Sequence, residues 1–138
     1  MTEKQGRTHP RPPKVTGLPH LFEAAGYSVA GARRLWRETA FRHIVAAFLA
    51  CLMLFTFLGA SGQEIALLFV LFFCLVATEA LNTAIESIVD HLAPDWQVFA
   101  RDAKDLGSLA TMCLLAANAV FIVAVLARLL ALIMKDNL

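Results

Sequence analysis

Three long apolar segments dominate the hydrophobic pattern, and they predict membrane-spanning helices. They cover residues 44–59, 65–90 and 106–134. About 20 helical residues cross a bilayer core, so the second and third segments are long enough, whereas the first is short unless flanking residues extend it. Asn118 lies alone within the third segment, where we expect it to form a hydrogen bond between helices. The pattern therefore predicts three transmembrane helices.

The chain outside these segments is polar or amphipathic. Residues 1–16 are polar and contain three prolines, so we expect a disordered tail. Residues 92–105 are polar and include Pro94, and they are predicted to form a loop between the second and third helices. Residues 17–138 are therefore expected to form a single membrane domain.

An amphipathic segment precedes the first apolar run. In residues 18–42, apolar side chains lie on one face and arginines on the other, which is typical of a helix on the membrane surface. We expect this helix to be interrupted near Gly26. Glu38 stands four residues from both Arg34 and Arg42, so its position is compatible with an ordinary ion-pair ladder on a helix surface.

Composition and charge support a membrane protein with a defined orientation. Hydrophobic residues make up 59% of the 138 residues and charged residues 17%, which is too apolar for an ordinary soluble domain. Eight of the twelve basic residues precede the first apolar segment, which predicts a cytoplasmic N-terminus. Near the opposite end, Arg128 is expected to extend outward toward the headgroups. Basic residues do not alternate with aromatic ones as in RNA-binding proteins, so no nucleic-acid partner is expected.

Four polar residues in the second apolar segment form the strongest candidate for a functional site. Glu79, Asn82, Glu86 and Asp90 are spaced by three, four and four residues, which places them on one face of a helix; we call this set the polar stripe. Ionisable groups at membrane depth are costly and usually face a protein interior or a water-filled cavity. The polar stripe therefore predicts a site that handles a metal ion or a proton.

The spacing along the polar stripe suggests two different tasks. Glu79 and Glu86 are two helical turns apart, about 10 Å, so they do not share one ion directly. Glu86 and Asp90 are placed to hold a hydrated divalent ion near the surface, while Glu79 lies at a depth suited to accepting a proton from a lipid headgroup. Lys104 and Asp105 follow at the end of the predicted cytoplasmic loop, just before the third segment.

These parts are compatible with two kinds of function. Phosphoryl transfer needs carboxylates for Mg²⁺, a cation for phosphate oxygens and a group that orients the nucleophile. The chain has no P-loop and no protein-kinase motif, so it would belong to neither common kinase class. A proton or cation path would use the same stripe, and the residues alone leave both possibilities open.

Four short strings carry a resemblance to a known family. Residues 79–90 read EALNTAIESIVD and residues 103–108 read AKDLGS, preceded by AAGYS at 24–28 and ETAFR at 38–42. Together these strings resemble the prokaryotic diacylglycerol kinase family over nearly all of the predicted folded chain. The resemblance implies an all-α membrane protein with three transmembrane helices plus an N-terminal amphipathic surface helix, assembled as a homotrimer with sites between subunits.

The same resemblance implies an activity and a set of site residues. The activity is ATP-dependent phosphorylation of diacylglycerol to phosphatidic acid, with Mg²⁺, at the cytoplasmic face of a bacterial inner membrane. Glu79 would be the catalytic base and Asn82 would support it. The metal would be held by Glu38 and Glu86. ATP would contact these two acids and Tyr27, Asp95, Trp96, Gln97, Lys104 and Asp105. The lipid would lie near Glu79, Ser108, Arg33 and Trp36.

Two positions depart from the family pattern, and two alternative functions stay open. His20 stands where the family often has an arginine and Ile44 where it often has a second glutamate, so neither receives a role. Undecaprenol is the alternative lipid substrate within the family, although AKDLGS and AAGYS look more like the diacylglycerol enzymes. A small cation or proton channel is the alternative of another class, but it gives Lys104 and Asp105 no task.

Overall fold

The computed structural model describes residues 18–136, and within this range the chain is helical and has no strands. It contains four helices: α1 (Leu18–Leu35), α2 (Thr39–Phe57), α3 (Gly62–Leu92) and α4 (Val98–Asp136). Side chains are described for residue 23 and for residues 25–135. The tail predicted for residues 1–16 lies outside the described residues, as does the side chain of His20.

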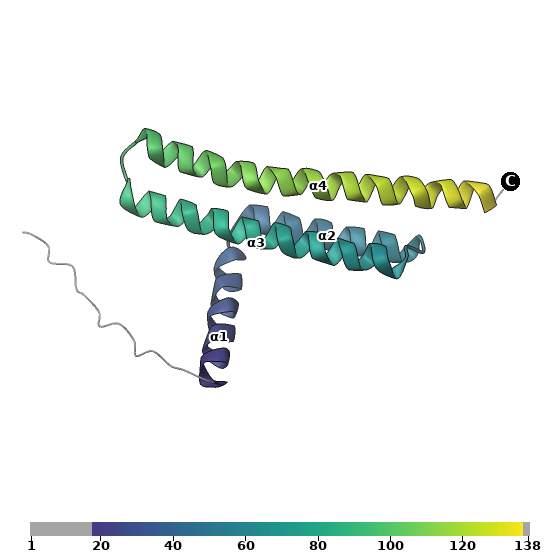
Figure 1. Ribbon diagram of the computed structural model, residues 1–138, viewed down its shortest axis with the longest axis horizontal. Coiled ribbons are helices and arrows are strands. Elements are labelled where there is room, and N and C mark those ends of the chain that lie inside the picture. Colours follow the sequence, from purple (N-terminus) through teal and green to yellow (C-terminus); the bar gives the residue numbers. More distant parts are fainter. Residues whose placement is uncertain (1–17, 137–138) are drawn as a thin grey trace, which may run out of the picture.

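Three of the helices lie side by side and the fourth crosses them. Figure 1 shows α2, α3 and α4 running along the long axis, with α1 nearly perpendicular to them. Each of α2, α3 and α4 is long and apolar enough to span a membrane, which confirms the three predicted spans. α3 is central, since it contacts α4 along much of its length as well as α2 and α1. A helix that crosses the bundle in this way is oriented to lie along the membrane surface.

Local sequence explains how α2 leads into α3. Gly59 follows the end of α2 with φ of +78°, a backbone conformation that glycine adopts without strain. Ser61 then caps α3: its hydroxyl accepts from the Glu64 backbone N–H, while the Glu64 carboxylate accepts from the Ser61 backbone N–H. This capping box fixes the first turn of α3.

The surface helix differs from the prediction in where it is interrupted. α1 continues through Gly26 and ends at Leu35, and the break lies at residues 36–38. Glu38 has an extended backbone, with φ of −76° and ψ of 131°, and occupies the N-cap position of α2. The expected interruption near Gly26 is therefore wrong, because a single glycine weakens a helix without ending it. α2 begins at Thr39, which gives the first span its missing length.

The loop predicted for residues 92–105 is also wrong in extent. α3 ends at Leu92, two residues before Pro94, and α4 already begins at Val98. Ala100 is buried against α3 together with Val89 and Ala93, and we call this group the loop-end core. Packing of small residues stabilises these first turns of α4 despite the charges around them. Lys104 and Asp105 consequently lie on a helix.

The opposite end of the bundle has a larger core, which we call the turn-end core. It consists of Phe55, Leu68, Val125 and Leu129. Beside it, Arg128 does not extend outward as expected but donates from Nε and Nη2 to the two carboxylate oxygens of Glu64, at 2.8 and 2.6 Å. A bidentate pair of this kind fixes the register of α4 against α3.

Asn118 forms the interhelical contact that the sequence predicts. Its Nδ2 donates to the backbone oxygen of Leu114 in its own helix at 2.8 Å and to that of Leu71 in α3 at 3.5 Å. The second of these bonds joins α4 to α3 within the span, so the structural role is confirmed.

Candidate active site

Glu79 lies near the middle of α3, between the turn-end core and the loop-end core. The residue is only 6% exposed, and Leu75 and Thr83, one turn away on either side, are buried as well. A carboxylate is costly to bury unless it is hydrogen-bonded, paired or used in chemistry. Glu79 is therefore the most deeply buried carboxylate of the polar stripe and its strongest candidate for a reacting group.

Asn82 connects the polar stripe to α4. Its Nδ2 donates a hydrogen bond to Glu86 Oε1 at 3.0 Å. Its Oδ1 is buried and accepts no hydrogen bond from the described residues. On α4, Gly107 comes so near that a Cβ there would lie 2.2 Å from this oxygen. The absence of a side chain at Gly107 is what allows the two helices to meet at Asn82.

A carboxylate from a distant part of the chain, Glu38, lies near the two glutamates of α3. Glu38 and Glu86 both lie close enough to Glu79 to act on its charge. Glu38 reaches this position because the chain bends between α1 and α2, and its carboxylate accepts a hydrogen bond from Arg34. The predicted ion pair of Glu38 with Arg34 is confirmed. The second predicted partner, Arg42, donates a hydrogen bond to Thr39 instead.

Glu38 and Glu86 have the chemistry of magnesium ligands. Both are half-buried carboxylates, so each keeps oxygen lone pairs open to solvent. Across the described part of the chain, no group of three or more His, Cys, Asp or Glu residues forms a metal cluster. Mg²⁺ is commonly held by one or two carboxylates and completes its shell with water and substrate phosphates, so the donor chemistry of Glu38 and Glu86 is compatible with this ion.

A polar pocket lies at the loop end of α3 and α4. Its volume is about 400 Å³, and its walls include both helices and the loop between them. Six of its lining residues are polar or aromatic members of the predicted site: Asp90, Asp95, Trp96, Gln97, Lys104 and Asp105. Lys104 Nζ pairs with Asp90 Oδ1 at 2.5 Å, which makes Asp90 the direct partner of the cation.

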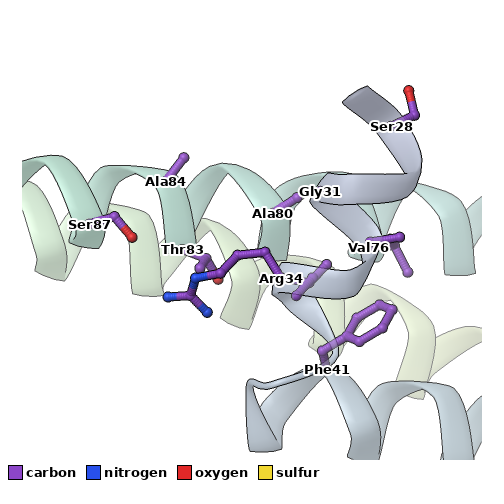
Figure 2. Close-up of a pocket in the computed structure, with 11 residues that line it drawn as sticks. Ser28, Gly31, Arg34, Phe41, Val76, Ala80, Thr83, Ala84 and Ser87 are labelled. Atoms are coloured by element: carbon purple, nitrogen blue, oxygen red, sulfur yellow. The ribbon is translucent and has the colours of Figure 1, made fainter. Parts of the chain in front are cut away.

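A second pocket lies where α1 crosses α3. Its volume is about 470 Å³, and it is mostly apolar. Figure 2 shows side chains from both helices around it, with Arg34 and Thr83 among the few polar ones. It lies at the same level along α3 as Glu79 and Asn82, since Ala80, Thr83 and Ala84 line it. Such a pocket is suited to apolar ligand groups.

Several predicted site residues are not gathered around Glu79 within one chain. Tyr27 is 70% exposed on α1, and Arg33 on the same helix and Ser108 on α4 are exposed as well. Trp36 lies in the bend after α1, 54% exposed, with its ring edge-on to Phe41 at 5.9 Å. These side chains are open to contact from outside the chain.

Two residues that the sequence reasoning missed belong to this region. Arg101 lines the polar pocket, and its guanidinium carbon lies 6.0 Å from the centre of the Trp96 ring. Thr111 is buried on α4 beside Glu79. Arg101 follows from helical spacing once α4 is known to begin at Val98, because it is one turn before Lys104. Thr111, one turn after Gly107, is recognised only from the packing of α4 against α3.

The fold and the site together define a small helical membrane protein with a carboxylate-rich site beside a polar pocket. A family model for prokaryotic diacylglycerol kinase matches residues 26–133. The chain is 46% identical to a diacylglycerol kinase from a Sinorhizobium species over 120 residues, covering 87% of each chain. It is 40% identical to a diacylglycerol kinase from Haemophilus influenzae over 98 residues, covering 69% of this chain and 81% of the other. It is 33% identical to a diacylglycerol kinase from Escherichia coli K12 over 99 residues, covering 71% and 81%.

The chain therefore belongs to the prokaryotic diacylglycerol kinase family. This confirms the family predicted from residues 79–90 and 103–108. It also confirms the expected class of activity, a membrane-bound kinase that phosphorylates an alcohol group of a lipid.

Proposed function

We propose that this protein transfers the γ-phosphate of ATP to the free hydroxyl of diacylglycerol, forming phosphatidic acid at the cytoplasmic face of a bacterial inner membrane. The observation that carries the proposal is the buried Glu79 carboxylate, close to both Glu38 and Glu86, in a chain of this family. The relatives named above are all diacylglycerol kinases, which favours this lipid over undecaprenol.

In the proposed reaction, Glu79 accepts the proton of the lipid hydroxyl. The hydroxyl oxygen forms a bond to the γ-phosphorus, the bond from that phosphorus to the β–γ bridging oxygen breaks, and ADP leaves with the electron pair. Asn82 supports Glu79 by holding Glu86 through its Nδ2 and by fixing the spacing of α3 and α4. The base and the reacting oxygen must be held within hydrogen-bonding distance for this transfer to be efficient.

Glu86 and Glu38 are the proposed magnesium ligands. When bound, Mg²⁺ neutralises negative charge on the phosphate oxygens. The two carboxylates come from α3 and from the bend before α2, so the ligand pair depends on the position of α1 relative to α3. Arg34 supports this geometry because it pairs with Glu38.

The polar pocket is the proposed nucleotide site. Lys104 supplies a cation for phosphate oxygens, and Trp96 supplies an exposed ring on which a base can stack. Asp95, Gln97 and Asp105 line the same pocket and offer acceptors for nucleotide hydrogen bonds. Glu86 lies near enough to Lys104 to act on its charge, so the pocket continues toward the proposed metal ligands.

We further propose that the active unit is a homotrimer with its sites between subunits. Tyr27, Arg33 and Ser108 are exposed in the single chain, which supports the proposal because a neighbouring subunit would bring such residues to a shared site. Large apolar side chains are also exposed along α4, among them Leu109, Val120 and Val123, and they offer surface for lipid or for another copy. The N-terminal excess of basic residues supports a cytoplasmic N-terminus.

The direct test is lipid phosphorylation by the purified protein in detergent micelles with Mg²⁺, [γ-³²P]ATP and diacylglycerol. Wild type should form labelled phosphatidic acid, and Glu79→Gln should lose nearly all turnover while still binding ATP, because the amide keeps the size but accepts no proton. Undecaprenol in parallel micelles should be a poor acceptor. Full activity of Glu79→Gln would remove Glu79 as the base, and ATP-independent ion flux in liposomes without lipid phosphorylation would favour a channel.

A further inference from the structure

The hydroxyl of Thr111 is unusual among the buried polar groups of this protein. Thr111 lies on α4 and is 8% exposed. Its Oγ1 is buried and has no hydrogen-bond partner among the described residues, a condition it shares only with Asn82 Oδ1 in that part of the chain. A buried hydroxyl without a partner costs free energy, so its retention requires a reason.

Threonines in membrane helices usually satisfy their hydroxyls within their own helix. Thr56 Oγ1 donates to the Leu52 backbone oxygen at 2.7 Å, and Thr78 Oγ1 donates to the Cys74 backbone oxygen at 3.0 Å. Both are bonds to the residue four positions earlier, the common arrangement for this side chain in a helix. Thr111 forms no such bond, so its hydroxyl is available for a partner on another helix.

The packing of α3 against α4 identifies that partner. The two helices are antiparallel, and Gly107 contacts Asn82. One turn further along α4 is Thr111, and one turn back along α3 is Glu79, so the register brings these two side chains to the same level. Thr111 is in fact a neighbour of the Glu79 carboxylate, but their hydrogen bond is not completed in this structure.

We propose that Thr111 is a positioning residue for Glu79: its hydroxyl donates a hydrogen bond to one carboxylate oxygen and leaves the other oxygen facing the lipid hydroxyl. The inference rests on the proposed role of Glu79 as the base. The bond would form when substrate binds, in keeping with catalytic hydrogen bonds that are loose without substrate and tighten when it binds. A base with one oxygen held in this way has one orientation rather than several, which raises the fraction of bound substrate ready to react.

The test compares three variants of the full-length protein in micelles, with kcat and KM measured separately for diacylglycerol and ATP. Thr111→Val keeps the shape and removes the hydroxyl, and it should lower kcat about fivefold with both KM values unchanged. Thr111→Ser keeps the hydroxyl and should restore kcat to near wild type. Thr56→Val is the matched control, because it removes a hydroxyl that bonds only to its own helix, and its kcat should equal that of wild type.

The possible results separate this inference from the proposed function. A kcat for Thr111→Val within twofold of wild type, or a Thr111→Ser enzyme as slow as Thr111→Val, would overturn the positioning role alone. A fall in thermal midpoint for Thr111→Val with both KM values raised would show a packing role and overturn it as well. Fully active Glu79→Gln, or wild type without lipid phosphorylation, would overturn the base assignment and this inference together.

Discussion

The Asn82 side chain lies directly against the backbone of Gly107, and this contact sets the distance between α3 and α4 beside the buried Glu79. A methyl group at Gly107 would meet Asn82 Oδ1 at 2.2 Å, while the nearest backbone atom, Asn82 Cα, would be 3.8 Å away. The side chain of Asn82 can move more easily than the backbone. Any substitution at Gly107 is therefore expected to displace the Asn82 amide before it prevents folding.

Gly107→Ala should consequently reduce activity more than stability. We expect kcat to fall at least about tenfold, because the displaced amide releases Glu86, while overpacking lowers the free energy of unfolding by about 1 kcal/mol. Steady-state kinetics and thermal unfolding in the same detergent measure the two effects. Gly62→Ala is the matched control, since nothing lies within 4 Å of a Cβ at Gly62. Equal kcat for Gly107→Ala and wild type would contradict the role of the contact.

Replacement of Glu86 should weaken magnesium-dependent nucleotide binding. Glu86→Ala removes one of the two proposed ligands and the acceptor for Asn82 Nδ2. We expect the KM for Mg·ATP to rise about tenfold or more, corresponding to the loss of one charge-assisted contact. A titration of activity against Mg²⁺ checks this, with the exposed Glu23→Ala as a control. Unchanged metal dependence in Glu86→Ala would argue against its role as a ligand.

The pair of Lys104 and Asp90 allows the cation and its partner to be tested separately. Lys104→Met should raise the KM for ATP about tenfold, because a phosphate contact is lost while the length of the side chain is kept. Asp90→Asn should have a smaller effect if Asp90 only orients Lys104 across their 2.5 Å contact. ATP binding measured by isothermal titration distinguishes the two. A larger loss for Asp90→Asn than for Lys104→Met would instead indicate that Asp90 contacts the metal or nucleotide itself.

Filling the apolar pocket beneath α1 should weaken binding of the lipid substrate without changing binding of the nucleotide. Ala84→Phe would fill part of its volume of about 470 Å³ from the α3 side. We expect a severalfold increase in the KM for diacylglycerol with the KM for ATP unchanged, since acyl groups then lose apolar contact. Ala84→Ser, which hardly changes the volume, is the control. An unaltered KM for the lipid in Ala84→Phe would mean that substrate does not use this pocket.

The ion pair between Glu64 and Arg128 should contribute to stability without contributing to turnover. It lies at the turn end of the bundle, far along α3 from the polar stripe. Glu64→Gln should lower the thermal midpoint slightly and leave kcat unchanged, because the hydrogen bonds from Arg128 and from the Ser61 capping box lose their charged acceptor. A drop in kcat with a normal midpoint would show that the register of α3 and α4 is transmitted to the site.

The sequence predicted those features that depend on hydrophobicity or on residues shared with the family. The lengths of the apolar segments predicted three spans, and the spacing of residues 79–90 placed the polar stripe on one face of α3. Sequence-based prediction of where the helices begin and end was wrong. Lys104 and Asp105 were assigned to a loop because local polarity outweighed the small residues Ala100 and Ala103, whose packing against α3 becomes visible only in three dimensions.

The assembly of the site was less accessible to sequence reasoning. Glu38 and Glu79 are 41 positions apart in the sequence. Their proximity depends on the bend at residues 36–38, which the local sequence did not predict. Thr111 was overlooked because a threonine in an apolar helix normally bonds to its own backbone. Its unsatisfied hydroxyl can be recognised only once α3 and α4 are docked.

The place where α1 crosses α3 marks the expected boundary between the part of the protein in the membrane and the part in water. From Gly62 to Thr83, which lines the crossing, α3 rises about 30 Å, and this is the thickness of the hydrocarbon layer. With residues 62–83 in the hydrocarbon layer, the rest of α3 and the first turns of α4 would project beyond it into water. On the proposed assignment of the polar pocket to ATP, the nucleotide would bind in water while the lipid hydroxyl stays at the membrane surface, so neither reactant would have to leave its own phase.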